Sequence, residues 1–585
     1  MLRKPIVLLV LGLLCFERHE LLAGETLPPA SRWIPDRAIL AVEVANPRPL
    51  LDAALSPKAA EGIAATRVYK QAAERPGFQQ FMFVIRYLEA RLGADWKTAL
   101  GKLLGGGASW AVMPDGTSLF IVDSLDAEML GKLHDCFVEF ARADAAKQDQ
   151  PNRVASADYR GVTGWTLGKD EAHAILGNRL VLANRPQMLK EVIDLRAGSG
   201  EGSLAALPGY QTARKAAGPD TVATAYLNLA ALKKHPPIQK ALAENPNPMA
   251  TLLFAGLLDA VRESNWLALG LRIAGTDVSL EAAVDAKPSG SSSLSAFSWP
   301  SLPDEGALPN LSVPRQILGL SFFRDLHAFY AAKDKLFPER TSGLIFFENM
   351  MGIFFSGRDL TEDIMAQPTP HIRFVVAEQK YDPEIGTPRV QLPAFAAVFR
   401  LRKPKQYADI VEEAWQKAVG LVSVTRGQKA QLGLVIDRAE HQNTRYSFAY
   451  FPSQPEDQKQ SLPTQFNFRP ALVKMGEYLV LSSTDGLAKD LIDALKRESA
   501  AQVKPSAGVH TQIELNAAAL GSVLRANRAH LIRQNMLDKG NSQEEAETQV
   551  DFLLSLVKAF GQAKLAVGAG KSGHLATLQL KLSPP

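Results

Sequence analysis

The side chains most often used for metal binding and catalysis, histidine and cysteine, are scattered along this chain. There is no H-E-x-x-H sequence and no paired cysteine motif, so the spacing typical of zinc sites is absent. His510 and Glu514 are four residues apart, but on an expected strand they lie well separated on one face. We interpret each histidine as a surface or half-buried imidazole and assign no metal ligand among His134, His173, His235, His327, His371, His441, His510, His530 and His574.

Cys136 and His134 could suggest a thiol nucleophile beside a base. Residues 125–146 are expected to form a helix, however, and positions two apart on a helix point to different faces. A free cysteine is also among the most buried residue types. We therefore expect Cys136 to be a small buried thiol on an amphipathic helix. It is the single cysteine left if Cys15 is removed with a leader, so no internal disulfide is expected.

Motifs that expose a catalytic serine or bind phosphate are also missing. Residues 198–202 read Gly-Ser-Gly-Glu-Gly, which is not the G-x-S-x-G spacing. Ser555 and Lys558 fit S-x-x-K, but they lie inside an expected apolar helix with no supporting motif. The three glycines 105–107 precede a strand rather than a helix, so they indicate a turn. The sequence assigns no catalytic residue and no cofactor, although a pair of carboxylates from distant segments stays open.

The N-terminus has the features of an export signal. Arg3 and Lys4 precede an apolar run over residues 5–16. That run is shorter than the roughly 20 residues that span a bilayer, and it fits a secretory signal. We expect a signal peptide over residues 1–23 and a periplasmic or extracellular mature chain without a transmembrane segment. Leu14 precedes Cys15 where a small residue is usual, which disfavours a lipoprotein.

The composition is that of an ordinary globular protein. Hydrophobic residues make up 46% and charged residues 22% of the 585 positions. Lys and Arg number 65 against 61 for Asp and Glu, a net charge of +4. A surplus this small gives no electrostatic reason to expect nucleic acid as a partner. The partner is expected to be a protein or a small molecule that the sequence does not identify.

Short segments recur in the same order in the two halves of the chain. The matched pairs are Arg37–Val44 with Arg315–Phe322, Gly93–Leu100 with Gly357–Ile364, Trp110 with Phe374, Gly177–Leu182 with Gly476–Leu481, and Leu267–Gly270 with Leu565–Gly568. A shared order predicts two modules that arose by duplication, 36–287 and 312–583. Residues 288–311 between them are rich in Ser and Pro and are interpreted as a linker.

Each module is expected to mix strands and helices. The first module should contain a strand at 39–44, helices over 47–103, a hairpin over 110–122, a helix at 125–146, four short strands between 154 and 183, a helix from Pro186, a strand at 222–227, two helices and a closing hairpin over 266–284. Strands joined mostly by hairpins, with helices grouped between them, predict an α+β fold with an antiparallel sheet. Asp95 is expected to cap the helix that begins at Trp96.

The late helices of the second module and the linker carry further signals. Gly540 is expected to end one helix, and Ser542 with Glu545 predicts a capping box for the next. The apolar stripe of that helix favours a packed helical hairpin over a DNA-binding motif.

In the linker we expect Phe297 or Trp299 to dock on a lobe, because burial is the common fate of such residues. The alternative is an exposed segment that binds a partner.

The segments Pro35–Val44 and Leu92–Trp96, with the glycines 105–107, resemble a group of exported bacterial proteins known only as a domain of unknown function. The shared motifs are apolar and structural. The resemblance therefore implies export and a repeated module, and it carries over no functional residue.

Three function classes are compatible with these observations. The favoured one is a non-catalytic, two-lobed binding or scaffolding protein, because the recurring motifs are strand cores, turns and caps. The second is an exported hydrolase with a site assembled from distant loops, which needs convergent polar groups in a cleft. The third is a periplasmic carrier that holds an apolar ligand between the lobes, which needs a large apolar cavity.

Overall fold

The computed structural model describes residues 27–55, 69, 73–74, 76–168, 170–243, 247–285, 296–300, 302, 304–337, 342–452, 461–569 and 574–583. The expected signal peptide, Cys15 and the Ser-rich stretch 289–293 lie outside these residues. The chain divides into two units, one holding Met1–Ala241 and Ser264–Ala286, the other Leu242–Glu263 and Lys287–Pro584. Within the described residues no helix is both long enough and apolar enough to cross a bilayer.

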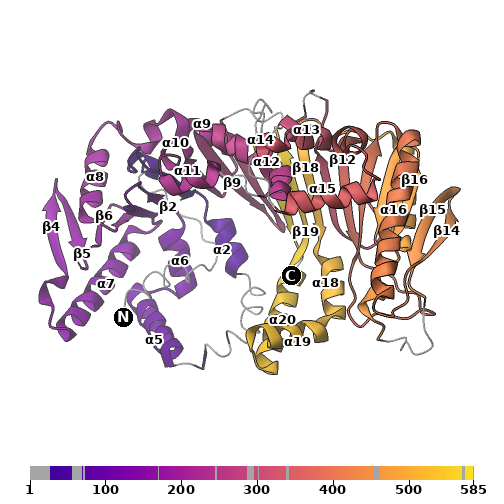
Figure 1. Ribbon diagram of the computed structural model, residues 1–585. Helices are drawn as coiled ribbons and strands as arrows, with labels where there is room; N and C mark the ends of the chain where they lie inside the picture. Colours follow the sequence, from indigo (N-terminus) through magenta and orange to yellow (C-terminus); the bar gives the residue numbers. More distant parts are fainter. Residues whose placement is uncertain are drawn as a thin grey trace. The chain divides into compact units, whose positions relative to one another are not determined.

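The first unit is built on an antiparallel sheet (Figure 1). Its strands are β1 (Leu40–Val44), β2 (Gly107–Val112), β3 (Ser118–Asp123), β4 (Ala155–Tyr159), β5 (Val162–Thr166), β6 (Ala172–Leu176), β7 (Arg179–Ala183), β8 (Ala223–Asn228), β9 (Trp266–Ala274) and β10 (Asp277–Val284). They pair in the order β4-β5-β6-β7-β3-β2-β1-β8-β9-β10, and every pair is antiparallel.

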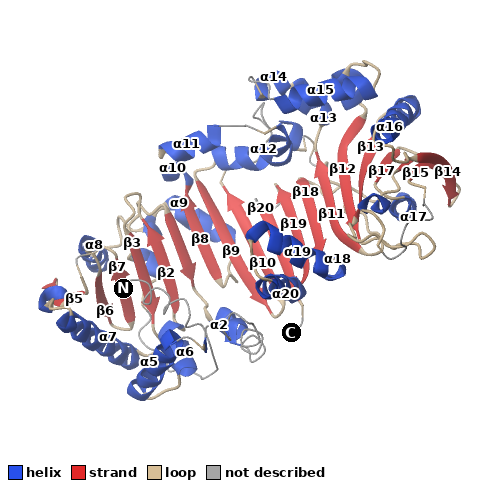
Figure 2. Ribbon diagram, turned by 60° about the horizontal axis from the view of Figure 1, so that its bottom comes forward, coloured by secondary structure: helices blue, strands red, loops and turns tan. Residues whose placement is uncertain are grey.

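Helices cover both faces of this sheet. They are α2 (Arg48–Leu55), α5 (Pro76–Leu92), α6 (Trp96–Leu104), α7 (Ala127–Lys147), α8 (Pro186–Ala197), α9 (Pro208–Ala217), α10 (Leu229–Leu232) and α11 (Pro236–Ala243). Helices α5, α6 and α7 lie on one side of the strands and α8 lies on the other (Figure 2). The main core contains side chains of α8 and α9 and the inward residues of β3, β6 and β7. A smaller apolar cluster lies under α5, α6 and α7.

The second unit also contains a ten-strand antiparallel set among its described residues. The strands are β11 (Gln316–Phe323), β12 (Pro368–Ala377), β13 (Ala394–Leu401), β14 (Val435–His441), β15 (Thr444–Tyr450), β16 (Ala471–Met475), β17 (Tyr478–Ser482), β18 (Val509–Asn516), β19 (Phe560–Gly568) and β20 (His574–Leu582). Their pairing order is β14-β15-β16-β17-β13-β12-β11-β18-β19-β20.

The helices of the second unit again pack on two faces. They are α12 (Pro248–Glu263), α13 (Leu326–Ala331), α14 (Lys333–Leu336), α15 (Ser342–Phe354), the π-helix η5 (Leu360–Met365), α16 (Pro404–Gly427), α17 (Asp485–Ala501), α18 (Ala517–Ala526), α19 (Arg528–Lys539) and α20 (Gln543–Ala559). Helix α17 contributes six leucine, isoleucine and alanine side chains to one core. Helix α16 contributes Tyr407, Val411 and Trp415 to the core of the opposite face.

The α+β class and the antiparallel sheet are confirmed, as are most local signals. Asp95 caps α6 by accepting from Lys97 N and Thr98 N. Gly540 ends α19 in the left-handed region, with φ of 68°, and Ser542 with Glu545 forms the capping box of α20. One count was wrong, because α10, α11 and α12 follow β8 where two helices were expected.

The linker residues after 295 pack into the second unit. One of Phe297 and Trp299 was expected to dock, and both are buried, with exposures of 2% and 5%. Phe297 belongs to an apolar cluster with Tyr330 and Leu344, and Trp299 meets the His510 ring edge-on at 4.4 Å. Helix α12 also groups with this unit, although the sequence placed residues 242–263 inside the module 36–287.

Candidate functional site

The clearest hollow in the first unit is an apolar cavity of about 230 Å³. It lies between α5, α6 and α7 on one side and the outward residues of β3, β6 and β7 on the other. Its lining is almost entirely leucine, isoleucine, valine, alanine and aromatic side chains. The described polar or titratable members are three: Glu89, His134 and His173.

Strand alternation explains how the cavity arises beside a well-packed core. Successive strand residues point to opposite faces of a sheet. On β3, Leu119 and Ile121 enter the main core, whereas Phe120 and Val122 line the cavity. The same alternation holds on β7, where Leu180 and Leu182 line the cavity, and on β6, where His173 lies between two alanines of the core.

Helix boundaries position the other wall. Helix α5 ends at Leu92, before Gly93 in the left-handed region with φ of 69°. Asp95 then starts α6, and Glu89 Oε1 accepts a 2.9 Å hydrogen bond from the backbone N of Trp96. This bond fixes the corner between the two helices. It also occupies one oxygen of the carboxylate that lines the cavity.

Two imidazoles meet at the wall of the cavity. His134 on α7 and His173 on β6 have their Nε2 atoms 3.0 Å apart, with the rings inclined at 63°. Trp165 on β5 packs edge-on against His134 at 5.4 Å and pairs in register with His173. Arg142 lies over the Trp165 ring at 5.5 Å. The histidine pair is therefore surrounded by aromatic and aliphatic groups.

Burial keeps His173 uncharged near neutral pH. His173 is 6% exposed, and its burial, followed by repulsion from His134, lowers the pKa of His173 to about 4. His173 can consequently form a hydrogen bond with a ligand as a neutral imidazole, without placing a net charge in an apolar cavity.

The sequence analysis missed this pair because 39 residues separate its members. A signal was nonetheless present. On α7, Leu130, His134 and Phe137 share one stripe at helical spacing, so a histidine interrupts an apolar face that lines the cavity. On β6, His173 alternates with Ala172 and Ala174, which places it opposite the core. Both histidines were interpreted only as surface or half-buried side chains.

The residues that the sequence analysis considered as possible catalytic or metal-binding groups have structural roles. Cys136 is a free thiol, 1% exposed, so the expectation of a buried cysteine is confirmed. Ser555 Oγ donates to the carbonyl oxygen of Phe552 within its own helix. His510 is buried, whereas Glu514 on the same strand pairs with Lys564. No group of three or more metal-ligating side chains gathers in the described part of the chain.

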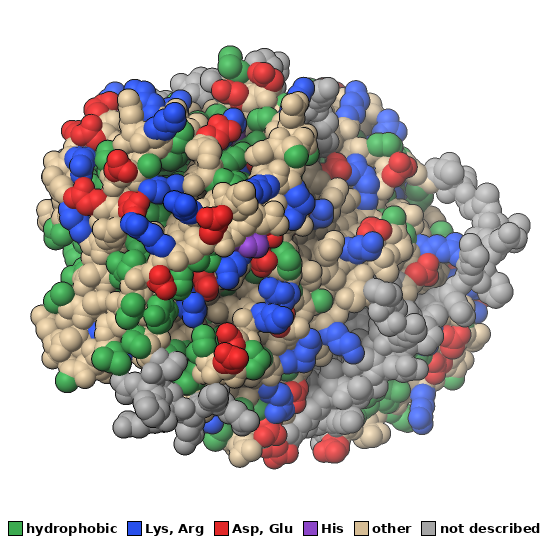
Figure 3. Space-filling model, turned by 90° about the vertical axis from the view of Figure 1, so that its right-hand side faces the viewer, with side chains coloured by type: hydrophobic (Ala, Val, Ile, Leu, Met, Phe, Trp, Pro, Cys, Tyr) green, Lys and Arg blue, Asp and Glu red, His purple; other side chains and the backbone are tan. Residues whose placement is uncertain are grey.

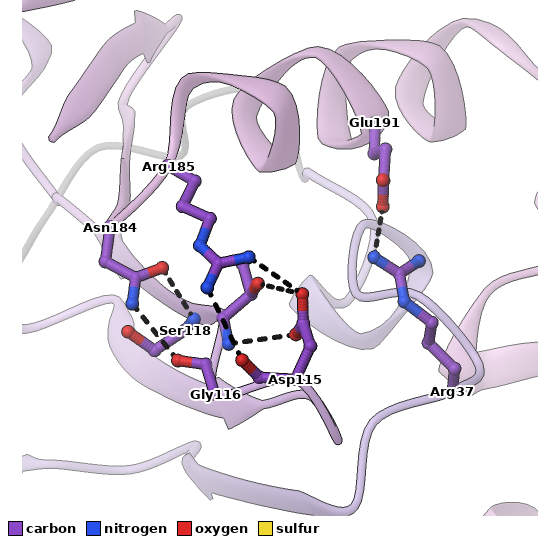
Figure 4. Close-up of polar contacts among 8 residues, drawn as sticks. Arg37, Asp115, Gly116, Ser118, Asn184, Arg185 and Glu191 are labelled. Atoms are coloured by element: carbon purple, nitrogen blue, oxygen red, sulfur yellow. Dashed lines mark hydrogen bonds and ion pairs between the residues drawn. The ribbon is translucent and has the colours of Figure 1, made fainter. Parts of the chain in front are cut away.

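A polar cluster at the β2–β3 turn is a structural clamp (Figure 4). Asp115 accepts from the backbone N of Thr117 at 3.0 Å and from Arg185 at 3.0 Å. Asn184 accepts from Ser118 N at 2.8 Å and donates to the carbonyl oxygen of Gly116. These bonds tie the hairpin turn to the start of α8. The groups satisfy one another, so the cluster presents no free catalytic group.

The second unit carries its own apolar groove, of about 510 Å³, between α16 and the strands β13, β16 and β17. Its lining includes Trp415, Leu434, Phe451 and Leu481. Phe395 at its edge is 54% exposed, so the groove opens to solvent. The end of this unit that bears β14–β16 shows basic and acidic side chains interspersed with apolar ones (Figure 3).

One family model matches part of the chain. Residues 139–300 match DUF3352, described as a protein of unknown function. The match confirms the expected resemblance to proteins that are known only as a domain of unknown function. The DUF3352 segment includes β6 and β7 of the cavity wall, with His173, Leu180 and Leu182. His134 lies five residues before it.

Structural similarity is weak. Crystal forms I and III of TP0453 match 45% of this chain and 81% and 83% of their own, at 11% and 9% identity and TM-scores of 0.22 and 0.20. Scores at this level carry no argument about fold or function. No curated protein sequence matches the chain.

Proposed function

We propose that the protein is a non-catalytic, exported binding protein that holds an apolar small molecule in the cavity of its first unit. The observation that carries this proposal is the lining of that cavity, in which aliphatic and aromatic side chains surround about 230 Å³. Ligand sites in proteins are mostly apolar with a few placed polar groups, which is the composition here. The sequence analysis placed a carrier's ligand between the lobes, whereas this cavity belongs to the first unit alone.

The size of the cavity favours an occupant. Aliphatic and aromatic side chains around a space of about 230 Å³ lack contacts that a hydrocarbon ligand would supply. Dry cavities lined by leucine and phenylalanine are known to take up apolar molecules. A bound hydrocarbon would recover the lost contacts.

The lining favours binding over hydrolysis. A nucleophilic enzyme needs a hydroxyl, thiol or amine next to a base. Among the described lining residues none is Ser, Thr, Cys or Lys. Cys136 is not among the lining residues and is 1% exposed. The polar groups present can orient a ligand, but they do not form a nucleophile–base pair.

We also propose that the two units are copies of one module. The strand order of the second unit repeats that of the first, strand for strand, and the registers support the same alignment. Val42 pairs with Trp110 and Leu320 with Phe374. Gly93 and Gly357 both have φ near 70°, and an aspartate caps the next element two residues later in each case.

One sequence match shifts in this alignment. Ala225 pairs with Leu269, and Ile513, the corresponding residue of the second unit, pairs with Leu565. By strand register, the residue of the first unit that corresponds to Leu565 is therefore Leu269. The sequence comparison had matched Leu565 with Leu267, two residues earlier. A shift of two residues along a strand leaves each side chain on the same face of the sheet. The apolar pattern alone therefore could not distinguish the two alignments. A crystal structure in which the two units differ in strand order would contradict duplication.

The binding proposal is tested by titrating the mature protein with 1-decanol in a calorimeter. We expect saturable binding by the native protein. Leu133→Trp fills the cavity and should weaken binding at least tenfold. Leu207→Trp is the matched control, because Leu207 is half-buried against the core of the opposite sheet face. Absence of binding by the native protein, or equal loss in both variants, would contradict the proposal.

Export is tested separately by the intact mass of the protein from its own host. Cleavage after Ala23 predicts a chain that begins at Gly24. A cytoplasmic protein that retains Met1 would contradict export.

A further inference from the structure

We infer that the ligand of the first-unit cavity is an amphiphile with a carboxyl group, and that this group binds at His173 while His134 and Asp135 connect the site to solvent. This inference rests on the proposed binding function and adds the chemical class of the ligand. It starts from the polar atoms of an otherwise apolar lining.

The number of protons in the histidine pair is fixed by its geometry. A neutral imidazole has one N–H donor and one acceptor nitrogen. The 3.0 Å contact between the Nε2 atoms therefore uses one N–H and one lone pair. His134 Nδ1 lies 3.6 Å from Asp135 Oδ1. A carboxylate favours the proton on that nitrogen, so His134 Nε2 accepts and His173 Nε2 donates.

This assignment leaves Nδ1 of His173 as an acceptor. Within the described residues the His173 side chain makes no second hydrogen bond. The donor that suits this nitrogen in an apolar cavity is the O–H of a carboxylic acid, or equivalently a carboxylate beside an imidazolium. Both descriptions contain the same number of protons. A hydrocarbon tail would then occupy the leucine-rich part of the cavity.

The histidine pair also leads from the cavity wall towards solvent. The Asp135 side chain is 75% exposed, the His134 side chain 13%, and His173 6%. In the assigned tautomers each N–H of this row points outwards, from His173 to His134 and from His134 towards Asp135. The proton taken up at neutral pH therefore enters with the ligand, as the neutral acid, and is shared between its carboxyl group and Nδ1 of His173. A neutral ligand of the same length needs no such proton.

Other charged groups near the histidine pair influence whether the carboxyl group of the ligand binds with or without its proton. Glu89 lines the cavity and Asp135 adjoins His134, and both disfavour an unprotonated carboxylate. Arg142 lies over the Trp165 ring, 5.5 Å from its centroid. Burial lowers the pKa of His173 to about 4 in the unliganded protein, so His173 is neutral before binding. A carboxylate ligand must raise that pKa.

The expected signature is proton-linked affinity. If binding takes up one proton, the affinity for decanoate should rise by up to about tenfold for each unit of pH lowered between pH 8 and pH 6. The affinity for 1-decanol should stay constant over the same range. Calorimetry in two buffers of different ionisation enthalpy should show one proton taken up with decanoate and none with decanol.

Variants distinguish this inference from simple apolar binding. His173→Gln replaces the basic imidazole nitrogen by a far less basic amide, so it should weaken decanoate binding at pH 6 at least tenfold and keep decanol binding. His327→Gln in the second unit is the matched control, because the His327 side chain is 38% exposed, and it should leave the binding of both compounds unchanged. Decanol binding with pH-independent or weaker decanoate binding would overturn the carboxyl assignment and leave the proposed function intact. Failure of both ligands would overturn both.

Two facing Nε2 atoms could instead bind a metal ion. Addition of Zn²⁺ alone provides that test. We expect no saturable binding by the native protein. Stoichiometric binding that disappears in both His134→Gln and His173→Gln would overturn the assignment of the pair to a carboxyl ligand.

Discussion

Arg324 Nε donates a 2.7 Å hydrogen bond to the carbonyl oxygen of Leu252 in α12. The other four N–H groups of this guanidinium donate to the carbonyl oxygens of Leu253, Phe323 and His510 and to Thr511 Oγ1. Arg324 is 1% exposed, and burial lowers its pKa to about 10. A buried cation is thus held by neutral oxygens that use all five of its donors.

Arg324→Lys should therefore destabilise the second unit by about 3 kcal/mol or more, because an ammonium group has three donors and leaves buried oxygens unpaired. Urea denaturation would measure the loss. Arg445→Lys is the matched control, since the Arg445 side chain is 91% exposed, and it should change stability by less than about 0.5 kcal/mol. Equal effects of the two variants would refute the role assigned to Arg324.

Gly256 in α12 makes close contact with the docked linker. A Cβ on Gly256 would lie 2.9 Å from Trp299 Nε1 and 3.0 Å from its Cε2. Gly256→Ala should cost about 1–3 kcal/mol, since overpacking displaces the indole. Gly352→Ala in α15 meets nothing within 4 Å and should be neutral or stabilising by up to about 1 kcal/mol.

Trp299 fluorescence gives a second readout of this contact. In a protein whose other six tryptophans are replaced by Phe, emission should resist iodide quenching, and Gly256→Ala should increase the quenching. A native Trp299 that iodide quenches freely would show that the segment is exposed and would favour the partner-binding alternative.

Cys136 should behave as a packing residue. It is 1% exposed, so Cys136→Ala should cost about 1 kcal/mol, as small truncations in a core do. The native thiol should react with iodoacetamide far more slowly than the thiol of the urea-unfolded chain, with the label mapped by peptide mass. Comparable rates in the two states would exclude burial.

His173 should make the first unit less stable in acid. Its pKa is lowered from 6.5 to about 4 in the folded protein, so between these values the unfolded chain binds more protons. Stability is therefore complete above pH 6.5 and falls as the pH drops towards 4, by roughly 3 kcal/mol in total.

His173→Leu removes this part of the pH dependence. Buried His510 in the second unit, whose pKa also lies well below 6.5 because of burial, contributes its own acid sensitivity to both proteins. The comparison is therefore the difference between native protein and variant in thermal unfolding at pH 5 and pH 7.5. Parallel stability curves for the two proteins would contradict the assignment.

The features that sequence predicted are those encoded by neighbouring residues. The hairpin around Pro114-Asp-Gly, the cap at Asp95 and the box formed by Ser542 and Glu545 each depend on a few adjacent positions, and each is present. Docking of Phe297 and Trp299 followed from the general cost of exposing aromatics. Residue type and local spacing suffice for such statements.

The candidate site depends on contacts between distant segments. His134 and His173 meet only after α7 packs on β6, and neither residue is unusual in its local sequence. The cavity itself is a region that side chains fail to fill, and periodicity does not report volume. The grouping of α12 with the second unit was missed for the same reason, because its partners Arg324 and Trp299 lie far along the chain.

The most direct test of an apolar ligand site is native mass spectrometry of the mature protein purified from its own host. The account predicts an additional mass that is removed by organic extraction, restored by incubation with a long-chain alcohol or fatty acid, and absent in Leu133→Trp but present in Leu207→Trp. A native protein that carries only its chain mass and takes up neither compound would contradict it.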